Sequence, residues 1–488
     1  MSRDTTLKLA TAVVALTLLA SPWRRELFVG DETKYAQVVR EMRGGAFFLP
    51  TLDGTPFTHK PPLHFWLIDL LTVPLGVYSM WPFVLPSIAG FAVLLWFMWR
   101  MEGWLAAFVC GASLLVWGSA QTARMDVTFT AAMVVAVWML MRERPIAAGV
   151  WAGIAVLIKG LMAPVVILLC AFAPRSGEKV AEGRMRGYIP GLLCMLAIPL
   201  TWFIPAMIRG GHTYTHDVLV KQTAERAVGA WVHRSPPWFY ILHAPADLVP
   251  WFFITVVAIV AAFKRNDGRA KFYVWWILAV IVPYSLLSSK LDVYMMAMIP
   301  PAALLVARLA AVDDVWTRRG NVANVAMSAL LLLIGIAGLF VKEVQPYRAT
   351  FVALAIAAVI ALVVSRGVIA STIALGLVPI AAVLFAIVTM MPTINELASG
   401  RPIVRAIAAQ HVRAHDVALY SSPYLWTRDM PRDFEHVRYV SPEELRVHPA
   451  TVVVTARKHA DEIAAVLGAY RKVDQFRMIG KWFDVYRR

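Results

Sequence analysis

Residues 30–66 read GDETKYAQVVREMRGGAFFLPTLDGTPFTHKPPLHFW, and they follow directly on the first apolar stretch of a very apolar chain. Charged side chains crowd the start of this segment, with Asp31 and Glu32 foremost. The spacing of VVREM and its neighbours predicts a short amphipathic helix from Glu32, which the side chain of Asp31 can cap. Capping is a purely structural role for Asp31, and the alternative is a functional role just outside the membrane.

The composition indicates a membrane protein. Of the 488 residues, 59% are hydrophobic and 16% are charged, and the mean hydropathy of +0.63 excludes a soluble domain of this length. The formal net charge of +16 lies mostly in short segments between apolar runs, which favours anionic headgroups and phosphate-bearing lipids over nucleic acid as partners. Cys110, Cys170 and Cys194 lie inside apolar runs, which predicts buried packing rather than disulfides or metal binding.

Apolar runs of on the order of 20 residues predict about thirteen membrane crossings. They begin near residues 7, 84, 103, 127, 146, 161, 189, 247, 272, 292, 323, 350 and 368. The first 22 residues resemble a signal peptide, but crossings continue downstream and no convincing cleavage site follows, so we interpret them as a signal anchor. Residues 61–78, PPLHFWLIDLLTVPLGVY, contain Asp69 and three prolines, and they either span the membrane or lie along its interface.

The positions of the basic residues favour the interfacial alternative. If residues 61–78 do not cross, the basic intervals fall on the N-terminal side of the membrane, which the positive-inside rule identifies as cytoplasmic. These intervals are Arg100, 142–144, 175–186, 264–271, 318–319 and Arg366. The opposite, outer face then carries residues 22–83, 121–126, 158–160, 209–246, 288–292, 342–348 and the C-terminal tail. The N-terminus is thus predicted to be cytoplasmic and the C-terminus to lie outside.

The tail differs in kind from the rest of the chain. Its patterns predict a helix over 401–415, strands over 416–423 and 450–458, a helix over 459–470, and one or two strands over 471–488. We expect a small α/β domain over residues 392–488 on the outer face, and a membrane domain over residues 1–391 whose first outer loop is 22–83.

Segments in fixed order along the chain resemble the bacterial GT-C glycosyltransferases that use polyprenyl-phosphate sugars. The first outer loop has their acidic pair, Tyr, REM helix and KPPL before an aromatic residue. The later segments are ARMD (123–126), VLIKGLMAPVV (156–166), WFIPAM (202–207) with HRSPPWFYI (233–241), and SLLSSKLDVYMMAMIPPAALL (285–305). They are similar to the lipid A aminoarabinose transferases and the related protein O-mannosyltransferases, and a soluble tail fits the aminoarabinose branch.

The resemblance implies a GT-C fold and an enzyme of the bacterial inner membrane. It implies transfer of a sugar from a polyprenyl, specifically undecaprenyl, monophosphate to a hydroxyl or phosphate of lipid A, a glycan or a protein, in a single inverting displacement at the outer face. No nucleotide is implied, and a divalent metal is left open. The aminoarabinose enzymes usually carry Glu before Lys-Pro-Pro, where this chain has His59. That difference weakens any inference to the amino sugar or to a metal there.

Transfer to a hydroxyl requires a base, and three carboxylates are candidates. Asp31 is the expected base because it lies on the outer loop, before a helix and beside apolar surface. Glu32 is the second candidate for the base, and the alternative is that it is an ordinary surface charge. Asp126 follows Arg124 at the N-terminal end of a predicted helix, where it either stabilises the helix or orients the acceptor or a cation.

The departing lipid phosphate requires cations. Lys60, Lys159 and Lys290 are the expected phosphate-binding residues, although each lies at the end of an apolar helix, where snorkelling is the structural alternative. Arg124 either joins them or simply pairs with Asp126.

Aromatic and imidazole side chains on the outer face are the remaining candidates. Those expected to line a sugar, lipid or acceptor cleft are Tyr35, Tyr294, Trp238, His59 and His233. Ordinary interfacial packing is the alternative for the aromatic residues. The outer-face histidines, which also include His64 and His243, show no metal-ligand spacing.

Two other classes of function compete with a transferase. A transporter or lipid flippase predicts inverted repeats and ionisable residues near mid-helix, whereas the charges of this chain concentrate at helix ends on one face. A noncatalytic sugar-lipid-binding subunit with the same fold is the other, and it predicts that Asp31→Asn leaves glycosylation unchanged.

Overall fold

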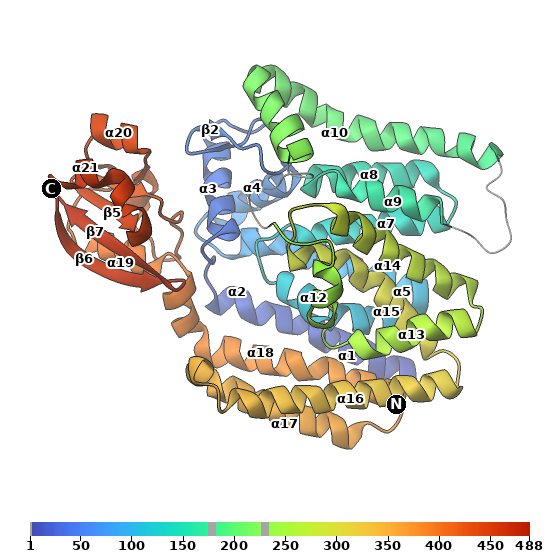
Figure 1. The fold of residues 1–488 in the computed structure, drawn as a ribbon. Coiled ribbons are helices and arrows are strands. Elements are labelled where there is room, and N and C mark those ends of the chain that lie inside the picture. Colours follow the sequence, from blue (N-terminus) through green and yellow to red (C-terminus); the bar gives the residue numbers. More distant parts are fainter. Residues whose placement is uncertain (1, 174–181, 226–233) are drawn as a thin grey trace. The chain divides into compact units, whose positions relative to one another are not determined.

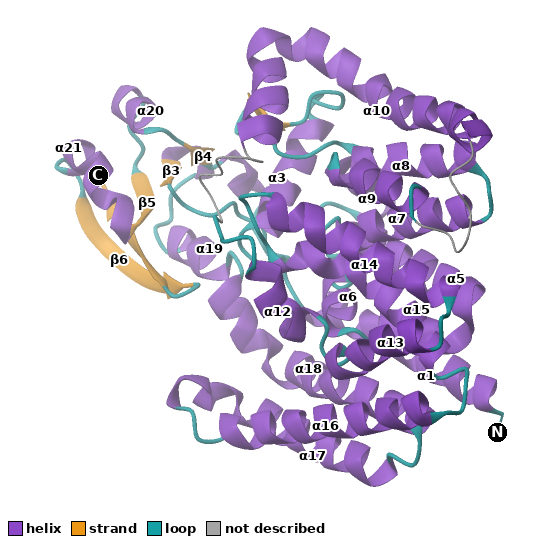
Figure 2. Cartoon of the chain, turned by 45° about the vertical axis from the view of Figure 1, so that its right-hand side comes forward, coloured by secondary structure: helices purple, strands orange, loops and turns teal. Residues whose placement is uncertain are grey.

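The computed structural model describes residues 2–173, 182–225 and 234–488, and it divides into two compact units (Figure 1). The first unit comprises Met1–Ser21, Thr58–His64 and Leu85–Ala386. The second comprises Pro22–Phe57, Phe65–Val84 and Ile387–Arg488. Helices build the first unit, whereas the second combines helices with two small sheets (Figure 2).

The first unit consists mainly of apolar helices. They are α1 (Arg3–Thr17), α5 (Trp81–Gly111), α6 (Leu114–Ser119), α7 (Asp126–Met141), α8 (Pro145–Lys159), α9 (Met162–Ala171), α10 (Glu182–His216), α12 (Phe239–Asp247), α13 (Phe252–Lys264), α14 (Gly268–Leu286), α15 (Ile299–Leu309), α16 (Val315–Gly338), α17 (Arg348–Val364) and α18 (Val368–Ala398). Short helical turns join them: η1 (Leu18–Ala20), η2 (Asp217–Glu225), η3 (Asp292–Met298) and η4 (Lys342–Tyr347).

The predicted helical membrane protein is confirmed, but its number of crossings is not. Within the described residues, 7 helices are long and apolar enough to cross a membrane, or 8 if α12 and α13, bent by 111°, form one span. Helix α5 is interrupted at Glu102 and at Gly103, whose φ is 81°. The two apolar runs predicted to begin near 84 and 103 are therefore separate helical segments, and the count of thirteen stays a prediction.

The ambiguous segment 61–78 forms α4 (Leu63–Leu75), with 13 residues. A helix of that length reaches about 20 Å, short of the roughly 30 Å of a bilayer core. Helix α4 is nevertheless as long as α13 and longer than α9, which are both among the predicted crossings, so both alternatives for residues 61–78 stay open.

A charged network joins several helix ends of the first unit on the side that the sequence predicts to be cytoplasmic. Glu102 accepts from Arg269 at 2.9 Å and from Arg308 at 3.4 Å. Arg308 also pairs with Asp267 at 2.7 Å. Because these residues come from α5, α14, α15 and the turn before α14, the network holds these elements in register.

The second unit contains the first outer loop, apart from Thr58–His64, and the C-terminal segment. Its helices are α2 (Ser21–Arg24), α3 (Asp31–Arg43), most of α4, α19 (Arg401–Ala408), α20 (Pro442–Val447) and α21 (Ala464–Leu467), with turns η5 (Ala414–Asp416), η6 (Arg432–His436) and η7 (Arg457–Ile463). Its strands are β1 (Thr51–Leu52), β2 (Thr55–Pro56), β3 (Val417–Tyr420), β4 (Arg438–Tyr439), β5 (Val452–Ala456), β6 (Arg471–Met478) and β7 (Lys481–Arg487).

The C-terminal sheet has the strand order β4-β3-β5-β7-β6. Strand β3 is parallel to β4 and β5, whereas β7 is antiparallel to β5 and β6. Apolar side chains cover both faces, with Val452, Val454 and Phe483 in one cluster and Val453 and Ile463 in the other. The predicted C-terminal α/β architecture is confirmed, with β4 and α20 in addition to the predicted elements, whereas its bounds, 392–488, stay a prediction.

The hairpin β6–β7 contains a buried carboxylate that forms ion pairs with two cations. Asp484 pairs with Arg457 at 2.7 Å and with Lys472 at 2.8 Å, and its side chain is 4% exposed. Burial opposes the charged form, but the hydrogen bonds from Arg457 and Lys472 keep the pKa of Asp484 below its ordinary value. These contacts fix the hairpin against the turn that follows β5.

Candidate functional site

A cavity of about 610 Å³ lies within the first unit. Its polar lining comes from segments far apart in the sequence: Thr58, His59, Lys60, Lys159, Gln222, Tyr284, Ser289 and Tyr294. Its apolar wall comes mainly from α8, α9, α10 and η2, with Met195, Leu196, Leu200, Trp202 and Phe203 from α10. The cavity thus combines two lysines with a long hydrophobic wall.

Lys159 is the last residue of α8, and the backbone that follows places it in the cavity. Gly160 ends the helix with φ 115°, a conformation that side-chain-bearing residues rarely adopt. The Lys159 ammonium forms an ion pair with Asp126 and lies 4.6 Å from the centroid of the Tyr294 ring and 5.4 Å from that of Phe129. The side chain is 9% exposed, so its charge is held in one place by a carboxylate and two aromatic faces.

Asp126 is the first residue of α7 and is the anionic partner of this lysine. Its other oxygen accepts from Arg124 at 3.2 Å, and its side chain is 5% exposed. The turn that carries it is fixed by Ser87, whose hydroxyl donates to the carbonyls of Thr122 and Arg124 at 2.9 and 2.7 Å. The predicted helix start at Asp126 is confirmed, and the carboxylate is directed at two cations rather than at solvent.

The lysine-bearing helix packs closely against the helix that forms the apolar wall. A Cβ at Gly149 of α8 would collide with the backbone of Gly191 in α10, so only glycine permits this approach. Helices α8 and α10 accordingly lie side by side in both views (Figures 1 and 2). Leu196 and Leu200 line the cavity and are 53% and 44% exposed, so the apolar wall continues onto the outer surface of α10.

The acidic pair of the first outer loop lies in the second unit, at the start of α3. Gly30, with φ 120°, occupies the N-cap position and Asp31 is the first helical residue, so the expected capping role of Asp31 is not observed. Glu32 is buried, pairs with Arg25, and accepts the backbone N–H of Phe28 at 2.9 Å. Glu32 therefore stabilises the fold of this loop, and the role of Asp31 as base stays a prediction.

Replacing Glu32 by Gln is expected to destabilise the first outer loop. The substitution removes the carboxylate charge that pairs with the buried Arg25 guanidinium, which is 5% exposed. Loss of such a charge-assisted hydrogen bond costs roughly 2 kcal/mol. A lower midpoint of thermal unfolding in detergent-purified protein checks this. Glu343→Gln, an exposed carboxylate in the turn before α17, is the control, and a midpoint no lower than that control would contradict the structural role.

Several other predicted residues lie away from the cavity lining. Lys290 donates to the carbonyl of Ser235 at 3.0 Å and to that of Leu287, and burial lowers its pKa. Trp238, which precedes α12, is 59% exposed, and Tyr35 of the second unit packs edge-on against Phe65 at 5.2 Å. His233 lies outside the described residues. Of the predicted phosphate-binding residues, Lys60 and Lys159 line one cavity, and so do Tyr294 and His59, which were predicted to line a cleft.

The described outer-face histidines have other contacts. His64 contacts the carbonyl of Ala123 at 3.0 Å, and His243 contacts Asp292 at 2.6 Å. Over residues 2–173, 182–225 and 234–488, no group of three or more His, Cys, Asp and Glu side chains is arranged to hold a metal ion.

Two kinds of cavity residue were not singled out from the sequence. The Tyr284 ring packs beside that of Tyr294 with their centroids 5.4 Å apart, and Tyr284 directly precedes the segment 285–305. Trp202 and Phe203 belong to the WFIPAM motif, which carries part of the family resemblance but gives these two residues no role. No sequence pattern indicates Gln222.

Comparisons with known proteins agree with this architecture. No protein-family model matches the chain. It is 28% identical over 349 residues to an undecaprenyl phosphate-alpha-4-amino-4-deoxy-L-arabinose arabinosyl transferase of Pseudomonas fluorescens, covering 64% of this chain and 57% of that protein. It is 26% identical over 397 residues to the enzyme of the same name from Pseudomonas aeruginosa, covering 73% and 70%. The first alignment thus spans little more than half of the relative's length.

Among solved structures, the crystal structure of ArnT from Cupriavidus metallidurans bound to undecaprenyl phosphate has a TM-score of 0.76. The superposition covers 99% of this chain and 98% of that one at 19% sequence identity. The chain therefore has the fold of ArnT, a GT-C glycosyltransferase fold, and it resembles the undecaprenyl-phosphate-dependent aminoarabinosyl transferases in sequence, as its ordered motifs predict.

Proposed function

We propose that the protein is a glycosyltransferase that takes its sugar from a polyprenyl monophosphate, with undecaprenyl as the lipid. The observation that carries this proposal is the cavity that joins Lys60 and Lys159 to the apolar wall of α10. A phosphate on a long hydrocarbon chain needs cations at one end and an apolar surface at the other, and this cavity offers both. The relatives named above carry undecaprenyl phosphate in their names, which supports the same donor lipid.

The ammonium groups are proposed to stabilise the departing phosphate. When the bond between the anomeric carbon and the phosphate oxygen breaks, negative charge grows on that oxygen, and cations placed beside it lower the barrier. Lys159 is held in place before the donor arrives, since Asp126 and two aromatic rings fix its ammonium. Little free energy is therefore needed to orient the Lys159 ammonium during the reaction.

Asp31 is proposed to accept the proton of the attacking hydroxyl. The hydroxyl oxygen bonds to the anomeric carbon as the polyprenyl phosphate leaves, which inverts that carbon in one displacement. Products are the glycosylated acceptor and polyprenyl phosphate. The resemblance to the aminoarabinose enzymes favours lipid A as acceptor over a glycan or a protein.

The proposed enzyme lies in the bacterial inner membrane with its site at the outer face. Thirteen crossings are proposed, because each apolar run of the sequence corresponds to a helix or helical segment in α1, α5, α7–α10 and α13–α18. With the N-terminus cytoplasmic, this count puts the tail from residue 392 outside.

Asp126 is proposed to act by positioning Lys159. We expect Asp126→Asn to lower the transfer rate, and to add little when Lys159→Gln is already present, because both substitutions remove the same oriented ammonium. Single-turnover rates for the two single variants and the double variant check this. Losses that multiply in the double variant would show that Asp126 acts independently of Lys159.

The test of the function uses purified full-length protein and a panel of lipid-phosphate sugars. Lipid A, a glycan and a peptide are offered as acceptors, and products are detected by mass. We expect one donor to give glycosylated acceptor and free polyprenyl phosphate in equal amounts. Failure with every lipid-phosphate donor would overturn the proposal. Translocation of the donor without product would favour a flippase instead.

A further inference from the structure

The segment that leads into α3 is held by groups from the C-terminal part of the second unit. We call residues 22–30 the lead segment; it runs from α2 to Gly30, and Asp31 follows it directly as the first residue of α3. After Arg24 its backbone forms neither a helix nor a strand, so its N–H and C=O groups need partners from elsewhere in the chain. Those partners determine where α3, and with it Asp31, begins.

Arg428 binds the first half of the lead segment. Its guanidinium donates to the carbonyls of Trp23 at 2.9 Å and of Arg25 at 2.8 Å, and also to that of Pro22. Helix α2 ends at Arg24, and the last carbonyls of a helix have no partner within it. Arg428 therefore caps this helix and fixes the direction in which the chain leaves it.

Asn395, near the end of α18, binds the middle of the lead segment. Its amide nitrogen donates to the carbonyl of Arg24 at 2.9 Å, and its amide oxygen accepts the backbone N–H of Glu26 at 3.2 Å. Asn395 is 3% exposed, so water does not compete for these two hydrogen bonds. The backbone on both sides of Arg25 is thus held by one side chain.

The last part of the lead segment is also bound to the chain around the end of α18. The backbone N–H of Val29 donates to the carbonyl of Ala398 at 2.8 Å. The Glu26 side chain is 1% exposed, and its carboxylate accepts from Arg401 at 2.8 Å. These contacts reach to within two residues of Asp31.

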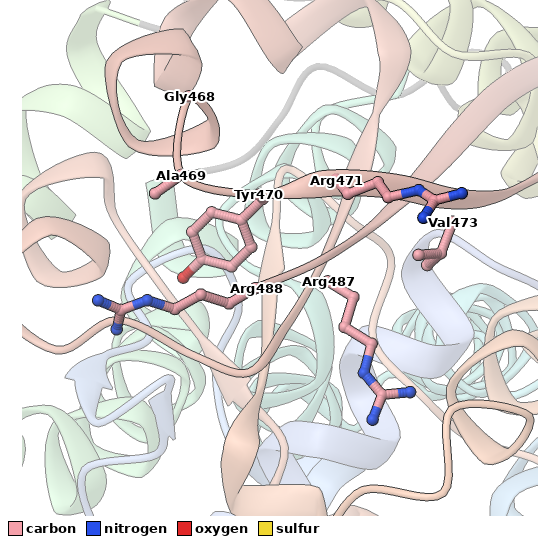
Figure 3. A pocket seen from close by; sticks show the side chains of 7 residues that line it. All are labelled: Gly468, Ala469, Tyr470, Arg471, Val473, Arg487 and Arg488. Atoms are coloured by element: carbon pink, nitrogen blue, oxygen red, sulfur yellow. The ribbon is translucent and has the colours of Figure 1, made fainter.

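Other arginines of the C-terminal domain do not converge on a common partner. Arg471, Arg487 and Arg488 line a hollow at the end of the β6–β7 hairpin, and Figure 3 shows their guanidinium groups pointing in different directions. Arg471 is exposed at the start of β6, whereas the guanidinium of Arg428 is directed at three carbonyls of the lead segment. Arg471 is therefore a control for the loss of one positive charge from this domain.

We propose that Arg428 and Asn395 are positioning residues for sugar transfer, which hold the lead segment so that Asp31 has a fixed place. This inference rests on the proposed function, in which Asp31 is the base. A base acts only within hydrogen-bond reach of the proton that it takes, and a displacement of about 1 Å can lower the rate about 10²-fold. The C-terminal part of the second unit thereby contributes to catalysis without contacting the substrates.

The rate test uses full-length Arg428→Gln, Asp31→Asn and the double variant, with Arg471→Gln as control. We expect Arg428→Gln to lower the single-turnover transfer rate about tenfold or more. The donor concentration that gives half the maximal rate is expected to stay within about twofold of wild type, because the donor cavity belongs to the first unit. Arg471→Gln is expected to transfer sugar at the wild-type rate.

The double variant separates positioning from a general loss of stability. If Arg428 acts through Asp31, Arg428→Gln is expected to lower the rate less than about threefold when Asp31→Asn is already present. A merely structural role predicts losses that multiply. Arg428→Lys is expected to restore little of the rate, because an ammonium keeps the charge but lacks the planar fork that reaches several carbonyls.

Hydrogen–deuterium exchange in detergent tests the same contacts without depending on activity. We expect peptides that cover the lead segment to exchange faster in Arg428→Gln and in Asn395→Leu than in wild type, because the backbone groups lose their partners. Arg471→Gln is expected to exchange as wild type does.

The outcomes distinguish this inference from the proposed function. Unchanged exchange in Arg428→Gln, faster exchange with an unchanged transfer rate, or losses that multiply in the double variant would each overturn the positioning role, even if wild type transfers sugar. A wild-type protein that is inactive with every lipid-phosphate donor would overturn the proposed function, and the positioning role with it.

Discussion

Lys159→Gln is expected to slow sugar transfer by about 10²–10³-fold, the usual loss when one preorganised charge-stabilising group is removed. The substitution keeps the length and polarity of the side chain but removes the ammonium that Asp126, Tyr294 and Phe129 hold in the cavity. Because the lost charge acts mainly on the leaving phosphate, the loss is expected in the rate of the chemical step. Single-turnover measurement with saturating donor checks this.

The control for this prediction is Lys264→Gln. Lys264 also ends an apolar helix, but it lies on the predicted cytoplasmic side and outside the cavity. If Lys159 only snorkelled, both variants would behave alike. Rates within about threefold of wild type for both would therefore contradict the phosphate-binding role of Lys159.

Asp31→Asn is expected to lower the transfer rate by about 10²–10⁴-fold, the range for loss of a general base. The amide keeps the shape of the side chain at the start of α3 but cannot accept the proton of the attacking hydroxyl. Because Gly30 occupies the N-cap, loss of the carboxylate does not remove the cap of the helix. The measurement is the transfer rate as a function of acceptor concentration.

Asp429→Asn is the matched control for Asp31. Asp429 also belongs to the second unit, and its side chain is 90% exposed. We expect the control to retain wild-type transfer. Unchanged transfer by Asp31→Asn would remove Asp31 as the base and would favour a noncatalytic subunit if no other carboxylate variant were inactive.

Helix positions and part of the site could be read from the sequence, because both depend on local patterns. The predicted helix starts at Asp126 and in the first outer loop are close to those observed, and the Lys-Gly turn places Lys159 at the cavity. Charges at the ends of apolar helices on one predicted face were enough to nominate Lys159 and Asp126. Their direct ion pair is a tertiary fact that no local pattern contains.

Residues whose role depends on distant partners could not be assigned correctly. Glu32 reads as a surface charge beside Asp31, and only the folded loop shows its burial against Arg25. Lys290 reads as a phosphate ligand at a helix end, whereas its ammonium is directed at the carbonyls of Ser235 and Leu287. For both residues, the position of the loop decides between a structural and a functional role, and composition and spacing do not encode that position.

The end of helix α19 could not be predicted from the sequence either. The periodicity over 401–415 predicts a helix of that length, but α19 ends at Ala408. His411 adopts a left-handed conformation with φ 50°. Glycine or asparagine usually signals such a turn, and neither stands there.

The most direct test of the central claim is photo-crosslinking with a polyprenyl phosphate that carries a photoreactive group in its first isoprene units. Peptide mapping by mass spectrometry then identifies the labelled residues in full-length protein. The cavity predicts adducts on α9, α10 and η2, at positions such as Leu196, Leu200 and Leu219, with labelling reduced in Lys159→Gln. Adducts confined to α16 and α17, or labelling unaffected by Lys159→Gln, would contradict the claim that this cavity receives the lipid phosphate.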